Sequence, residues 1–185
     1  MNKNVSLILA FVLLLVVSAV YRVVPGRPPG FAPQYSMAVF GGAVFLKDKK
    51  WAFVLPVVSL FISDLLYQLL FKLGVSTIPG FYDGLLVNYI IFASVTFFGF
   101  LLKKWNVWNI AVVSVLAATY YFILSNFAMW LFSGFYPRTM DGLKACYVAA
   151  IPFYKNSVAA SLVFSALLFG GYYLVKQKSA KAMVE

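Results

Sequence analysis

The sequence predicts an all-α membrane protein: six transmembrane helices in one bundle, forming a single domain over residues 1–185. The chain is 63% hydrophobic and 11% charged, and its mean hydropathy is +0.91. Soluble domains are about 45–50% apolar and about 25% charged. One transmembrane helix takes about 20 residues, so six take roughly 120 and leave only short connections. The composition therefore argues against a soluble enzyme, a disordered chain or a nucleic-acid-binding protein, and the lipid bilayer is the expected partner.

Long apolar runs place the spans at about 5–22, 33–46, 51–73, 85–102, 105–132 and 156–175. The first run ends at Tyr21 and Arg22, an interfacial aromatic followed by a charge. The alternative is a cleaved signal peptide. It is less favoured because the apolar run is long for that role and Ser18-Ala19-Val20 is a poor cleavage site.

The second span is the weakest of the six. It follows the stretch 24–33, whose prolines and glycines allow neither a helix nor a central strand. The span is short and contains Gly41-Gly42. It therefore needs shielding by neighbouring helices or a locally thinned bilayer.

The longest connection, 133–155, precedes the last span. Within it, the sequence predicts a short amphipathic helix over 141–151. We expect Asp141 to cap its start and Pro152 to stop it.

Positive charges indicate the orientation. Lysine clusters follow the second, fourth and sixth spans, so nine of the 15 Lys and Arg residues lie on the side of the termini and six on the other. The positive-inside rule then places both termini in the cytoplasm. Arg27 and Arg138 fall in the outer loops, where binding groups usually lie.

Asp64 is the one carboxylate well inside a predicted span. A charge at the bilayer centre costs about 2.5–3.5 kcal/mol on insertion scales, so it normally faces a cavity or a partner. Gln68 and Lys72 follow at i+4 and i+8 and share its helix face. Asp64 is thus either part of a ligand site that opens outward or the partner of Lys72, Arg27 or Arg138.

Other polar residues extend the candidate site. Tyr121 and Asn126 in the fifth span either line the outer cavity or join helices by hydrogen bonds. Arg27 and Arg138 are donors suited to an anionic solute or to lipid headgroups. The predicted substrate-binding set is Arg27, Asp64, Gln68, Tyr121, Asn126, Arg138 and Asp141.

The sequence lacks the residues that metal binding, catalysis or nucleotide binding would require. The sequence has no His and a single Cys, Cys146, so we expect no metal site, no cofactor and no catalytic residue. It also lacks a phosphate-binding Walker loop. Energy for transport must come from a partner or an ion gradient.

Short motifs along nearly the whole chain resemble an uncharacterised bacterial family described as transport proteins. They are Arg27-Pro28-Pro29-Gly30-Phe31-Ala32-Pro33, Leu60-Phe61-Ile62-Ser63-Asp64, Ser125-Asn126-Phe127, Tyr136-Pro137-Arg138-Thr139, Gly142-Leu143, Cys146-Tyr147 and Ala150-Ile151-Pro152-Phe153.

In size and layout the chain also resembles the substrate-binding S components of energy-coupling-factor (ECF) vitamin transporters. That resemblance implies capture of a vitamin or metal ion from outside and docking on a separate membrane subunit that carries two ATPases. The S components place a small-xxx-small motif on their first helix, and Ser6-xxx-Ala10 is the nearest match here.

The leading hypothesis is a transport protein that captures a small solute, anionic or vitamin-like, in an outward-facing cavity. The alternative is a structural or assembly protein that binds a partner through its outer loops. A membrane enzyme using Asp64 as acid or base is a third reading, weakened by the absence of a second intramembrane carboxylate or any His.

Overall fold

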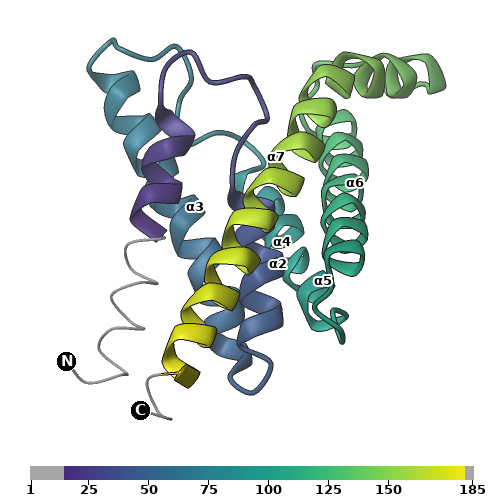
Figure 1. Ribbon diagram of the computed structural model, residues 1–185. Helices are drawn as coiled ribbons and strands as arrows, with labels where there is room; N and C mark the ends of the chain where they lie inside the picture. The colour runs from purple at the N-terminus through teal and green to yellow at the C-terminus, as the bar shows by residue number, and fades with distance from the viewer. Residues whose placement is uncertain (1–14, 182–185) are drawn as a thin grey trace.

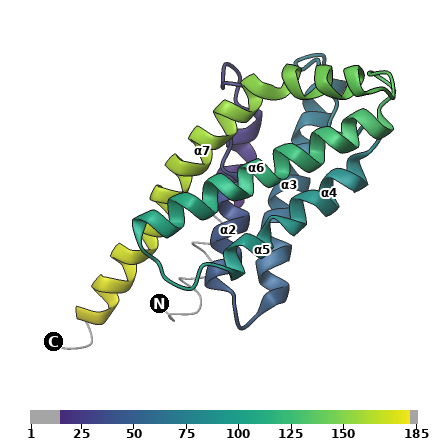
Figure 2. The same cartoon turned by 90° about the vertical axis from the view of Figure 1, so that its right-hand side faces the viewer.

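The described part of the chain, residues 15–181 of a computed structural model, is helical and contains no strand. After a helical segment at 15–23, the helices are α2 (Gln34–Val44), α3 (Lys49–Lys72), α4 (Leu85–Ser94), α5 (Thr96–Phe100), α6 (Val107–Phe132) and α7 (Met140–Lys181). The all-α prediction is therefore confirmed for these residues. Figures 1 and 2 show the helices gathered into one bundle.

Three of these helices are long and apolar enough to cross a membrane: Lys49–Lys72, Val107–Phe132 and the Met140–Gln177 part of α7. The other predicted spans differ in form. Span 33–46 is the 11-residue α2, and span 85–102 is divided at Val95 into α4 and α5. Only the end of span 5–22 lies within the described residues.

Helix α2 forms the centre of the bundle. Nine of its eleven residues are buried, and it contacts α3, α5, α6 and α7. Eleven residues rise only about 16 Å, about half of a bilayer core of about 30 Å. A helix too short to span the bilayer needs protein around it at membrane depth, and α2 is enclosed in this way.

The connection 24–33 dips from the top of segment 15–23 into the molecule before α2 begins (Figure 1). Side chains of α7 bind its carbonyl groups: Asn156 donates to the Pro29 oxygen at 2.8 Å and Ser157 to the Gly30 oxygen at 3.0 Å. These bonds satisfy two backbone acceptors and hold the later part of the connection against α7, while residues 24–26 are exposed.

Helices α2 and α5 cross at two glycines. A Cβ atom on Gly99 would lie 2.1 Å from the Val39 carbonyl oxygen, and one on Gly42 would lie 2.4 Å from the Thr96 carbonyl oxygen. No side chain fits in either place. Gly41-Gly42 in the weak second span therefore serves close helix packing.

The predicted short helix over 141–151 is wrong as a separate element. Pro152 does not stop it, since α7 is a single helix of 42 residues with Pro152 in its interior. Proline removes one backbone hydrogen bond and crowds the carbonyl four residues earlier, here Val148, so it bends a helix that has other reasons to continue. Figures 1 and 2 show the first part of α7 running across the top of the molecule before the helix turns downward.

The two ends of the bundle differ in the connections and charged residues that lie there. We call the lower end in Figure 1 the lysine end, because the α2–α3 turn, the α5–α6 connection and the end of α7 meet there and carry Lys47, Lys49, Lys50, Lys103, Lys104 and Lys176. The opposite, loop end holds the connections 24–33, 73–84 and 133–139.

Candidate functional site

Asp64 lies in a buried ion pair with Arg22. One Asp64 carboxylate oxygen accepts a short hydrogen bond from Arg22 Nη1, and the other accepts from the Tyr89 hydroxyl at 2.6 Å. The Asp64 side chain is 2% exposed and that of Arg22 is 22% exposed. The pair links segment 15–23 to α3, and the hydrogen bond from Tyr89 links α4 to the same carboxylate.

The Arg22 guanidinium is held on several sides. Its Nη1 also donates to Ser63 Oγ at 2.6 Å, and its guanidinium carbon lies 5.4 Å from the centre of the Tyr67 ring. The Tyr67 hydroxyl in turn donates to the Arg22 carbonyl oxygen at 2.7 Å. A charge pair this fully bonded is well suited to joining helices.

Two other predicted site residues bind backbone groups. Arg27 donates to the carbonyl oxygens of Phe31 at 2.7 Å and Arg22 at 3.0 Å, which holds the connection 24–33. The Gln68 carboxamide oxygen accepts from the backbone N–H groups of Gly80 and Phe81, both at 3.1 Å. Gln68 thereby holds the α3–α4 connection against α3.

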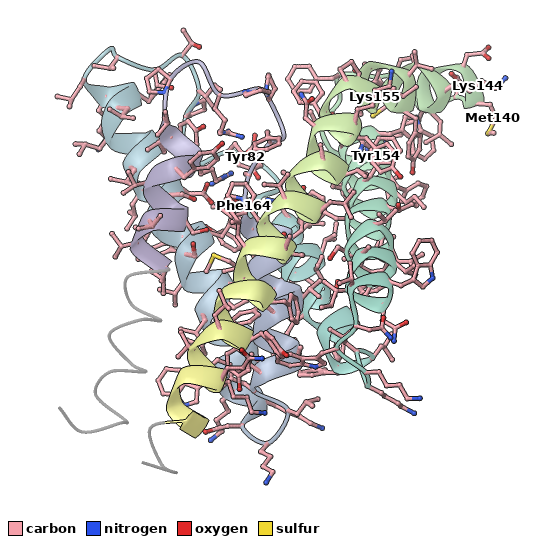
Figure 3. The ribbon with its side chains drawn as sticks, in the orientation of Figure 1. Tyr82, Met140, Lys144, Tyr154, Lys155 and Phe164 are labelled. Atoms are coloured by element: carbon pink, nitrogen blue, oxygen red, sulfur yellow. The ribbon has the colours of Figure 1, made fainter. Side chains whose placement is uncertain are left out.

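The remaining charged candidates lie on the surface. Arg138 is exposed in the α6–α7 connection. Asp141 pairs with Lys144 at 3.6 Å, with both side chains more than 70% exposed. Figure 3 shows Lys144 at the far end of the first part of α7. The seven predicted residues are therefore not brought to one place.

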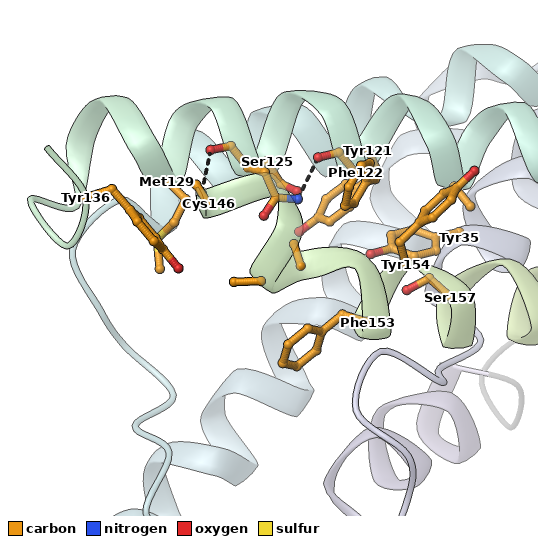
Figure 4. A pocket seen from close by; sticks show the side chains of 14 residues that line it. Tyr35, Tyr121, Phe122, Ser125, Met129, Tyr136, Cys146, Phe153, Tyr154 and Ser157 are labelled. Carbon is orange, nitrogen blue, oxygen red and sulfur yellow. Dashed lines mark hydrogen bonds between the residues drawn. The ribbon is translucent and has the colours of Figure 1, made fainter. Parts of the chain in front are cut away.

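Tyr121 and Asn126 do line a common cavity. It measures about 290 Å³ and lies between α6 and the bend of α7. We call it the elbow cavity. Figure 4 shows Tyr136 near one end and Tyr35, Tyr154 and Ser157 near the other. Its walls combine aromatic and small side chains with a few polar groups, the pattern typical of small-molecule sites.

Helix periodicity explains the α6 wall. Ala118, Tyr121, Phe122, Ser125 and Met129 recur at intervals of three and four residues, so they share one face of α6. From α7, Ala149, Ala150 and Phe153 border the cavity on either side of Pro152. The bend thus separates the two arms of α7 enough to leave the cavity between them and α6.

Some polar atoms of the cavity already have partners. Tyr121 donates a short hydrogen bond to Asn88 on α4, Tyr154 shares one with Thr119 at 2.8 Å, and Ser157 bonds to Gly30. Asn126 uses its amino group on the Phe122 carbonyl oxygen at 2.7 Å. Within the described residues, the Asn126 carboxamide oxygen and the Ser125 hydroxyl make no further hydrogen bond, so both can bind a ligand.

A second cavity of about 230 Å³ lies on the other side of Ser125 and Met129, between α6 and the start of α4. Tyr82, Asp83 and Asn88 line it. Burial, together with the negative charge of Asp64, raises the pKa of Tyr82.

Sequence reasoning missed Arg22 as the partner of Asp64. Arg22 looks like an interfacial charge at the end of the first span, and its pairing depends on how segment 15–23 packs on α3. The one usable signal was that a buried carboxylate needs a cation. The proposed docking residues Ser6 and Ala10 lie outside the described residues.

These features define a class: a helical protein with membrane-length apolar helices, a buried charge pair and a cavity at the loop end. The chain belongs to the family of unknown function DUF6580, whose model matches residues 2–183. No curated protein and no solved structure matches the chain.

Proposed function

We propose that the protein is a bacterial inner-membrane protein that captures a small solute in the elbow cavity as a step in transport. The single observation that carries this proposal is the cavity itself, about 290 Å³ with aromatic walls and uncommitted polar groups that include those of Asn126 and Ser125. Ligand sites typically measure about 300–1,000 Å³, so the solute is small. Lysine clusters at the opposite end favour an outward-facing loop end, with both termini in the cytoplasm.

The lining favours an uncharged solute. No charged side chain is among the fourteen described residues that border the elbow cavity. An anion buried there without a cation would be costly, and Arg27 already binds carbonyl oxygens. Of the anionic and vitamin-like alternatives, the lining supports a neutral, partly aromatic compound that donates hydrogen bonds to Asn126 and Ser125.

The proposed role is capture without covalent chemistry. Asp64, the residue on which an enzymatic reading depends, is bonded to Arg22 and Tyr89 and does not border the elbow cavity. Passage across the membrane would then depend on a conformational change or on a separate energy-coupling subunit, as in the S-component resemblance.

The test is to fill the cavity and look for a bound compound. Ala150→Phe places a ring in the elbow cavity, whereas Ala159→Phe makes the same change at an exposed position of α7. Each full-length protein is purified from membranes, and small molecules are extracted and identified by mass spectrometry. We expect one compound near equimolar ratio in the wild type and in Ala159→Phe, and its loss from Ala150→Phe.

Two results would contradict solute capture. One is a compound that remains in the folded Ala150→Phe protein at the wild-type level. The other is a wild-type protein that carries no small molecule and instead co-purifies with one protein partner in stoichiometric amount, which would favour the assembly role.

A further inference from the structure

The largest cavity described lies at the lysine end, away from the proposed solute site. It measures about 550 Å³ and lies between the end of α2, Trp105 in the α5–α6 connection and the last turns of α7. We call it the lysine-end groove. Its border includes Val44, Trp105, Tyr172, Lys176 and Gln177.

An aromatic wall gives the groove a fixed shape. The Trp105 ring meets Phe169 edge-on, with centres 5.1 Å apart and planes at 84°, and its centre lies 5.3 Å from that of Tyr172. Trp and Tyr are enriched at the membrane interface, at the depth of lipid headgroups. On α7 the neighbouring Tyr173 and Leu174 are exposed, which provides an apolar surface running away from the groove.

The charge at this end strongly favours an anion. Segments 45–50, 101–106 and 173–181 contain eight lysines and a single acidic residue, Asp48. Lys176 brings an ammonium group and Gln177 an amide to the border of the groove. Basic pockets between membrane helices on the cytoplasmic side commonly bind anionic headgroups.

We propose that the lysine-end groove binds the headgroup of an anionic phospholipid, with its phosphate near Lys176 and its acyl chains along the exposed apolar side of α7. A cation, an amide donor, an aromatic wall at headgroup depth and an adjacent apolar surface match such a lipid as a whole. A free anion would use only the polar part of this arrangement. The site is separate from the elbow cavity, so it stands whether or not that cavity binds a solute.

The experiment measures lipid binding to the full-length protein in detergent micelles by native mass spectrometry and thermal unfolding. Phosphatidylglycerol is compared with phosphatidylcholine of the same acyl chains. We expect phosphatidylglycerol to remain bound and to raise the melting temperature more than phosphatidylcholine does. Lys176→Gln should weaken phosphatidylglycerol binding about fivefold, the effect of one basic residue near an anionic lipid.

The controls separate this groove from the general positive charge. Lys50→Gln removes one exposed charge at the same end but outside the groove and should leave lipid affinity within twofold of wild type. Trp105→Leu, which keeps every charge, should weaken binding by removing the aromatic wall. Equal losses in Lys50→Gln and Lys176→Gln would overturn the proposal, as would equal binding of the two lipids or stabilisation by inorganic phosphate alone.

Discussion

At the scale of single residues, Arg22–Asp64 is the one buried salt bridge among the described residues. Asp64 accepts hydrogen bonds on both carboxylate oxygens, and Arg22 is further supported by Ser63 and Tyr67. Removing one member of a buried pair strands the other charge, whereas replacing both with apolar residues is often nearly neutral. The pair therefore predicts a clear pattern of stability among variants.

Asp64→Asn should lower the free energy of unfolding by about 3 kcal/mol, because Arg22 stays buried without its counter-charge. The double variant Arg22→Met/Asp64→Leu should recover part of that loss. Unfolding in detergent by denaturant measures both. Asp141→Asn is the matched control, since its partner Lys144 is exposed and the change should have almost no effect. A fully stable Asp64→Asn protein would assign Asp64 a role other than helix pairing.

At the scale of elements, glycines and one amide set how segments approach each other. Gly42 and Gly99 allow α2 and α5 to touch backbone to backbone. Gln68 replaces a missing strand or helix partner for the α3–α4 connection by accepting two backbone N–H groups. The glycine contact and the Gln68 hydrogen bonds can each be removed by one substitution, and a matched control variant exists for each.

Gly99→Ala should destabilise the protein by about 1–3 kcal/mol, because the new methyl group overlaps the Val39 carbonyl oxygen and the helices must move apart. Gly170→Ala is the same change on α7, where no atom lies within 4 Å of the new group. It should keep or raise stability by up to about 1 kcal/mol through helix propensity. Melting temperatures of the two variants test this, and equal effects would contradict the close crossing.

Gln68→Leu should loosen the α3–α4 connection, since two backbone donors lose their acceptor. We expect tryptic cleavage after Lys72, where α3 ends, to become about fivefold faster or more. Gln68→Glu keeps an oxygen at the same position and should cleave near the wild-type rate. Cleavage that is equally fast in both variants would mean that the loss of the amide, rather than of the acceptor, loosens the connection.

At the scale of the whole molecule, the separation of lysines from the loop end predicts how the chain lies in the membrane. In a Cys146→Ala background, single cysteines at Thr77 and Thr139 should react with a membrane-impermeant thiol reagent in intact cells. Cysteines at Asp48 and Lys103 should react only after lysis. All four positions are exposed in the structure, so labelling depends on sidedness. External labelling at Asp48 would reverse the proposed orientation.

Composition and apolar run length were enough to predict the helical class, the long α3 and α6, and the weakness of the second span. Composition and run length could not distinguish a membrane-length helix from the short, buried helix α2, because both are apolar runs in the sequence. Pro152 was read as a helix end, yet a proline inside a packed helix produces a bend instead. The effect of Pro152 depends on contacts that α7 makes with α6 and with connection 24–33.

The candidate site was less predictable than the fold. Tyr121 and Asn126 line the elbow cavity because they share one face of α6 with Ala118 and Met129, a pattern visible in the sequence. The charged candidates were chosen for their residue type, and charge alone does not distinguish a ligand group from one that binds a carbonyl oxygen. Arg27 and Gln68 both proved to hold loops.

The bend at Pro152 has a mechanical consequence. Residues 153–177 of α7 rise about 37 Å from the elbow cavity toward the lysine end. A change of about 10° in the angle at Pro152 would therefore move the far end of this arm by about 6 Å. A solute that widens the angle at Pro152 would therefore displace the nearby cavity residues only slightly. It would displace Lys176, near the far end of the arm, much more. Binding at the elbow cavity would then reach the lysine end through residues 153–177 of α7.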